Sequence, residues 1–86
     1  MTTMKETYRY IVHSTDVIAN AARLDGTRIG VHDVVGLLQN GETVDSVTDC
    51  FAGVSRAQVY ECLAYYEDHR AEIDYQIARQ MSEAGG

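Results

Sequence analysis

The stretch GETVDSVTDCFAGVSRAQVYECL, residues 41–63, decides the fold of this chain. Thr43 precedes a short run of residues with helical apolar spacing, and threonine is a common helix N-cap. Gly53 interrupts this pattern, and Ser55 then precedes a longer run with the same spacing. A short helix, a glycine-containing turn and a longer serine-capped helix are the parts of a helix-turn-helix.

Each of these two predicted helices has one apolar face. The residues on these faces are Val44, Val47 and Phe51 in the shorter helix and Val59, Cys62, Leu63 and Tyr66 in the longer. We expect Phe51 and Val54 to fill the angle between the two helices, because Gly53 allows the chain to reverse tightly there.

Upstream of this stretch the sequence predicts one further helix and a small β element. The helix begins at His32 and ends at Asn40, where Gly41 can adopt the left-handed conformation that closes a helix. Its apolar stripe consists of Val34, Leu37 and Leu38. The β candidates are Tyr8–Val12, Ala21–Leu24 and Thr27–Val31, the last two joined by Asp25-Gly26, a two-residue hairpin signal that needs positive φ at both positions.

We therefore expect a mainly α protein: a small N-terminal β element, a winged or three-helix helix-turn-helix, and a C-terminal helical extension. Residues 1–66 form the predicted DNA-binding domain, and residues 67–86 form a helical partner-binding tail.

The first turn of the longer helix carries candidate DNA-contacting side chains, because this turn enters the major groove in a helix-turn-helix. Arg56 is able to read guanine through two hydrogen bonds, and Gln58 is able to read adenine. Ser55 and Tyr60 are candidates for phosphate contacts. The alternative is an ordinary solvated helix face that binds nothing.

The formal net charge of −6, from 13 acidic and 7 basic residues, argues against an electrostatic nucleic-acid binder that works alone. A local basic face remains compatible with this charge, and Arg23 and Arg28 are further candidates for phosphate contacts. The acidity also suits a basic protein partner. The alternative interpretation is plain solubility.

The cysteines and the apolar content point to the cytoplasm. Cys50 and Cys62 fall at apolar helix positions and are interpreted as buried free thiols. No apolar run approaches the roughly 20 residues of a membrane span, and the first eight residues lack the apolar stretch of a signal peptide.

No catalytic constellation is apparent, so we expect neither an enzyme nor a metal or cofactor site. His13, His32 and His69 are scattered over a strand end, a helix start and a helix–tail junction. His32-Asp33 is interpreted as a helix start with a favourable acidic first turn rather than an acid–base pair.

The tail carries an apolar stripe that has no obvious cover in the chain. Its residues are Tyr66, Ile73, Ile77 and Met81. Isolated helices of this length are marginal in water, so the stripe predicts a partner, either a second copy or another protein. The alternative is a tail that folds back or pairs in a homodimer.

The order of these features resembles the domain-of-unknown-function 433 family. The resemblance rests on Gly26-Thr27-Arg28-Ile29, a helix ending in Asn40-Gly41, the helix-turn-helix, and Ala64-Tyr65-Tyr66. The family is similar to the winged helix-turn-helix of VapB-type antitoxins. The chain departs from the family pattern at Gly30, where proline is usual, and at Asn20-Ala21-Ala22-Arg23, where a Gly-Gly-Lys-Pro-like run is usual.

The resemblance implies a dimeric DNA-binding antitoxin that represses its own operon. It further implies a PIN-domain ribonuclease toxin as the partner, covered by the C-terminal helix. The competing interpretation is an acidic helical adaptor that binds proteins and no DNA.

Overall fold

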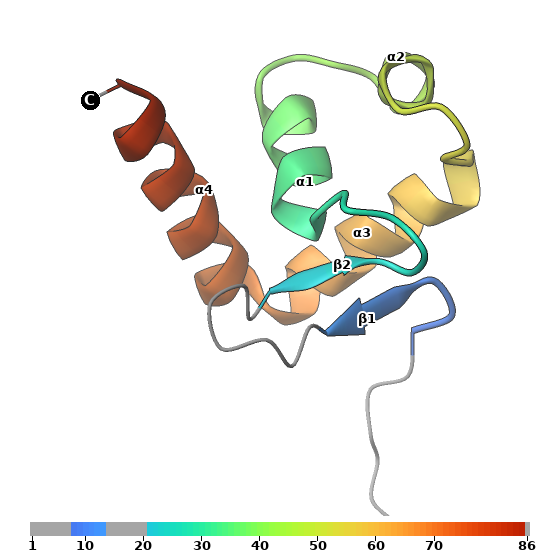
Figure 1. Cartoon of the computed structure of the whole chain (residues 1–86), viewed down its shortest axis with the longest axis horizontal. Coiled ribbons are helices and arrows are strands. Elements are labelled where there is room, and N and C mark those ends of the chain that lie inside the picture. The colour runs from blue at the N-terminus through green and yellow to red at the C-terminus, as the bar shows by residue number, and fades with distance from the viewer. Residues whose placement is uncertain (1–7, 14–20, 86) are drawn as a thin grey trace, which may run out of the picture.

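The structure is a computed structural model that describes residues 8–13 and 21–85. It is mainly helical, with a two-stranded antiparallel sheet near the N-terminus, which confirms the expected fold class (Figure 1). The elements are β1 (Ile11–His13), β2 (Ala22–Leu24), α1 (Val31–Gln39), α2 (Val44–Cys50), α3 (Arg56–Asp68) and α4 (Arg70–Gly85).

The sheet pairs β1 with β2, so that Ile11 lies opposite Leu24. The hairpin predicted at Asp25-Gly26 is wrong in two respects. Only Gly26 has a positive φ, of 79°, whereas the predicted turn type requires it at both positions. The run after the turn contributes a single bridge, from Gly30 to Arg23, instead of a strand.

The reason is the start of α1, which draws this run into a helix. The Asp33 carboxylate accepts a hydrogen bond from the Gly30 backbone N–H at 2.9 Å, and α1 begins at Val31. The expected acidic first turn is thereby confirmed. The predicted end is confirmed as well, since Asn40 caps α1 and Gly41 follows with a φ of 105°.

The caps of α2 and α3 are those predicted from the sequence. The Thr43 hydroxyl oxygen accepts from the Ser46 backbone N–H at 3.0 Å, and the Ser55 hydroxyl oxygen accepts from the Gln58 backbone N–H at 3.2 Å. Each cap satisfies a backbone donor that the first turn of a helix leaves unpaired.

Helix α1 is the centre of the molecule and contacts β2 and the three other helices. In Figure 1, α4 lies on one side of α1 and α2 on the other, while α3 runs below α1 with β2 in front of it. The side chains buried most completely come from every helix and from β2: Leu24, Val31, Val34, Val35, Val47, Val59, Cys62 and Ile73.

The expectation that the tail lacks a cover within the chain is wrong. Helix α3 ends at Asp68, the following residue His69 has a φ of −137° that is not helical, and α4 then runs back along α1. Ile73 is completely buried and Ile77 packs partly against the core. The alternative in which the tail folds back is therefore the one observed, because the apolar face of α1 supplies the missing cover.

Candidate functional site

The corner between α2 and α3 presents the first turn of α3 at the surface. Phe51 ends α2, Gly53 has a φ of 86°, and the Val54 backbone N–H donates to the Phe51 carbonyl at 3.1 Å. Val54 is buried and Phe51 is half-buried against the core, so these two side chains fill the corner as predicted. The packing fixes the direction of α3 while Ser55 and Arg56 stay exposed.

Ser55 and Gln58 hold the start of α3 reciprocally. In addition to the serine cap, the Ser55 backbone N–H donates to the Gln58 side-chain carbonyl at 2.7 Å. Reading adenine with two hydrogen bonds uses both the carbonyl and the amide of glutamine. With its carbonyl engaged in the cap, Gln58 offers the amide N–H groups alone unless the cap opens.

Arg56 is held by α2, a contact that sequence reasoning missed. Its Nη1 forms an ion pair with the Asp45 carboxylate, and its Nη2 donates to the Tyr60 hydroxyl at 3.2 Å. The guanidinium also lies over the Tyr60 ring, 5.7 Å from its centroid. No local signal predicts the Asp45 contact, because the two residues lie 11 positions apart on opposite sides of a turn.

The other two arginine candidates lie near the turn that follows β2. The guanidinium of Arg23 donates from Nη1 to the Thr27 carbonyl at 3.3 Å and is partly buried. Arg28 is exposed in the loop that leads to α1. Figure 1 shows this loop and the start of α3 toward the same side of the molecule, at the right of the view. Contact of these arginines with DNA stays a prediction.

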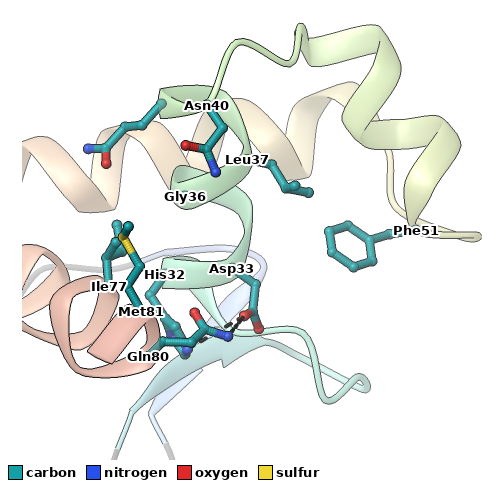
Figure 2. Close-up of a pocket in the computed structure, with 10 residues that line it drawn as sticks. His32, Asp33, Gly36, Leu37, Asn40, Phe51, Ile77, Gln80 and Met81 are labelled. Carbon is teal, nitrogen blue, oxygen red and sulfur yellow. Dashed lines mark hydrogen bonds and ion pairs between the residues drawn. The ribbon is translucent and has the colours of Figure 1, made fainter. Parts of the chain in front are cut away.

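A second feature is a pocket between α1 and α4 with a volume of about 570 Å³ (Figure 2). Its apolar lining consists of Leu37, Phe51, Ile77 and Met81, and its polar lining of His32, Asp33, Gln39, Asn40 and Gln80. The Gln80 amide donates to the Asp33 carboxylate at 3.2 Å, which ties α4 to the start of α1 at one side of the pocket.

The pocket divides the four candidate partner-binding residues into two pairs. Tyr66 and Ile73 are buried within the chain and are not available to a partner in this conformation. Ile77 and Met81 line the pocket, and Met81 is 66% exposed. The expectation that all four residues are available to a partner is therefore wrong for Tyr66 and Ile73.

Two of the three histidines that the sequence leaves scattered meet around Tyr65. The Tyr65 hydroxyl lies 3.0 Å from His13 Nε2 and 3.1 Å from the Glu72 carboxylate, and the His69 ring stacks on the Tyr65 ring at 4.3 Å. This polar cluster joins β1, α3 and α4. Within residues 8–13 and 21–85, no group of histidine, cysteine or acidic side chains has the arrangement of a metal site.

The two free cysteines differ in burial. Cys62 is buried, and burial together with the neighbouring Glu61 raises the pKa of its thiol to about 12. Cys50 is exposed at the end of α2, so the expectation that both thiols are buried is wrong for this one. Because α2 has only seven residues, apolar periodicity does not fix which of its positions are buried.

The helices of the described chain include none that is long and apolar enough to cross a bilayer. The comparison with curated proteins found no match. Among solved structures, the chain is similar to a DUF433 member protein from Anabaena variabilis, with 28% sequence identity and a TM-score of 0.74. That similarity covers 79% of this chain and 67% of the other.

The family comparison covers the sheet, α1, α2 and most of α3. Residues 11–66 match the family described as "Protein of unknown function (DUF433)". This match spans more than half of the 86 residues. The chain belongs to the DUF433 family.

Proposed function

We propose that this chain is a DNA-binding regulator whose α2–α3 corner is a helix-turn-helix. The observation that carries the proposal is the exposed first turn of α3, capped at Ser55 and directed outward by the buried Val54. A helix N-terminus held rigidly in this way is suited to enter the major groove, because its backbone amides and first side chains then reach base edges and phosphates.

The side chains of the corner divide into two roles in this proposal. Arg56 reads a guanine edge, and the Gln58 amide donates to an acceptor on a neighbouring base. Ser55, Tyr60 and the arginines near the β2–α1 turn, Arg23 and Arg28, hold phosphates. We also propose a homodimer, which the family resemblance implies, because a dimer is able to read two half-sites about one helical turn of DNA apart.

The biological role that we propose is that of an antitoxin that represses its own operon in the cytoplasm. The family resemblance to VapB-type antitoxins supports this role, with a PIN-domain ribonuclease toxin as the partner. The net charge of −6 favours a basic partner. Since Tyr66 and Ile73 are buried, the surface proposed for the toxin is the pocket edge formed by Ile77 and Met81.

A gel shift of the purified protein on its own upstream DNA tests the DNA-binding proposal. We expect a sequence-selective shift that Arg56→Ala weakens by about 1–3 kcal/mol, with relaxed base preference at one position. Arg70→Ala, on α4, is the matched control and is expected to leave the shift unchanged. An equal loss on every DNA sequence would assign Arg56 to the phosphate backbone instead.

A protein-binding adaptor is the second candidate, and the pocket between α1 and α4 favours it. An apolar pocket of this size beside an exposed methionine suits a partner's side chain. Co-purification distinguishes the two candidates. A chain that shows no DNA shift at micromolar concentration, yet loses a protein partner on Met81→Asp, is an adaptor.

A further inference from the structure

The contact between Asp45 and Arg56 suggests how the start of α3 is regulated. We propose that the Asp45 carboxylate occupies the N–H group of Arg56 that would otherwise read a guanine edge, so that Arg56 engages DNA only when DNA displaces Asp45. This inference rests on the DNA-binding function proposed above, and it adds an autoinhibitory contact within the same corner.

The geometry places an anion on Arg56 in the absence of DNA. Arginine pairs with carboxylates and with the O6 and N7 acceptors of guanine through the same N–H groups. Here Nη1 is paired with Asp45, while Nη2 is directed at the Tyr60 hydroxyl and the guanidinium lies over the Tyr60 ring. Both terminal nitrogens of the guanidinium therefore have a partner in the absence of DNA, and the partner of Nη1 is an anionic carboxylate.

The contact is also weak enough to exchange. The side chains of Arg56 and Asp45 are 55% and 77% exposed, respectively, and ion pairs in such positions are largely screened by water. A DNA groove presents a row of phosphates and base acceptors, which outcompetes a single carboxylate. Tyr60 remains beside the guanidinium during the exchange, so Arg56 is released from α2 without losing its direction.

A second aspartate on α2 provides a control that distinguishes the Asp45 contact from the general effect of an acidic surface. Asp49 lies one turn after Asp45 on the same helix and is exposed as well. The ion pair of Arg56 is with Asp45. Neutralising either aspartate changes the net charge by the same amount, but only the change at Asp45 unmasks Arg56.

Fluorescence anisotropy with a labelled 20-base-pair duplex from the chain's own upstream DNA tests the inference. The proteins compared are wild type, Asp45→Asn, Asp49→Asn, Arg56→Ala and the double variant Asp45→Asn/Arg56→Ala. We expect Asp45→Asn to bind about three- to tenfold more tightly than wild type, because the competing anion is removed. The change for Asp49→Asn is expected to stay within about twofold, as its charge is exposed and screened. In the Arg56→Ala background the gain from Asp45→Asn should disappear.

Each outcome separates the inference from the function on which it rests. Equal gains for Asp45→Asn and Asp49→Asn, or a gain that persists without Arg56, would overturn the autoinhibitory contact while leaving DNA binding established. Binding by Asp45→Asn but not by wild type supports both. If no variant binds the duplex while circular dichroism shows that all are folded, both the DNA-binding function and the inference are wrong.

Discussion

Gly30 shows at the scale of one residue how the start of α1 is built. Its φ of −80° is open to any residue, so backbone conformation is not the reason for a glycine. The reason is space: a Cβ at this position would lie 2.6 Å from the His32 ring. A proline at this position would also remove the backbone N–H that donates to the Asp33 carboxylate. Glycine at position 30 therefore leaves space for the His32 ring and supplies the N–H that donates to Asp33.

Gly30→Ala is expected to lower the free energy of unfolding by about 1 kcal/mol, because the His32 ring at the end of its side chain must turn away from the new Cβ. His32→Ala removes the ring that a Cβ at position 30 would contact. Adding Gly30→Ala to that variant should therefore lower the free energy of unfolding much less. Urea unfolding of the four proteins in this cycle measures the coupling. Gly26→Ala is the control, because its φ of 79° makes it costly in either background. The same loss with and without His32 would contradict the steric explanation.

The two thiols are expected to react at very different rates. At pH 8, iodoacetamide should modify the exposed Cys50 within minutes and Cys62 only as the chain unfolds, since the pKa of Cys62 is raised to about 12. Mass spectrometry over time counts the adducts. Rapid double labelling of the folded chain would contradict the burial of Cys62.

The same raised pKa gives a stability effect with a defined sign. In the unfolded chain the Cys62 thiol ionises near its ordinary pKa of 9.0, whereas in the folded chain it retains its proton to about pH 12. The unfolded state therefore binds fewer protons above pH 9, and stability is lost as the pH rises from there. Cys62→Ala should show a smaller loss than wild type between pH 8 and 10, as measured by urea unfolding at each pH.

At the scale of elements, α4 gains its stability from one buried position. Ile73 is completely buried, whereas Met81 is two-thirds exposed on the same helix. Two hydrogen bonds near the beginning of α4 support this docking: the Tyr65 hydroxyl donates to Glu72, and the Tyr66 hydroxyl donates to Asp74 at 2.8 Å. The hydrogen bond to Asp74 also raises the pKa of the Tyr66 hydroxyl.

Ile73→Ala is expected to lower the free energy of unfolding by about 2–5 kcal/mol, through lost burial and the cavity left behind. In a chain of 86 residues this is a large fraction of the total stability. Met81→Ala is the control on the same helix and should change stability by less than about 0.5 kcal/mol. Chemical denaturation with a circular dichroism readout compares the two. Equal effects would mean that α4 does not dock on α1 in solution.

For the whole molecule, the acidic net charge limits how DNA can be bound. Three arginines, Arg23, Arg28 and Arg56, are proposed to contact DNA in a chain that carries a net charge of −6. Each phosphate neutralised releases bound counterions, and the salt dependence of affinity counts them. We therefore expect a protein that binds weakly and relies on base contacts rather than on its overall field.

The logarithm of the DNA association constant should fall with the logarithm of salt concentration with a slope of about −3 or shallower for one copy of the chain. Anisotropy titrations between about 50 and 200 mM salt measure this slope. Arg28→Ala should reduce it by about one unit with little change in sequence preference. A slope of about −6 per copy would contradict the proposed contacts, because it requires more phosphates neutralised by arginine than this set provides.

The sequence by itself determined the features that depend on near neighbours. The caps at Thr43 and Ser55 and the end of α1 at Gly41 are as predicted. A cap joins groups three residues apart, so the local sequence contains both partners. The apolar spacing likewise predicts α1, α2 and α3, because burial of one face follows helical periodicity.

Only the tertiary structure decided which distant groups meet. The pairing of β1 with β2, the contact of Asp45 with Arg56 and the approach of His13 to Tyr65 each join residues at least nine positions apart. The burial of Ile73 belongs to the same class, since an apolar stripe requires a cover without specifying it. Whether that cover comes from α1 or from a partner depends on the angle at which α4 leaves His69, and periodicity along one helix does not contain that angle.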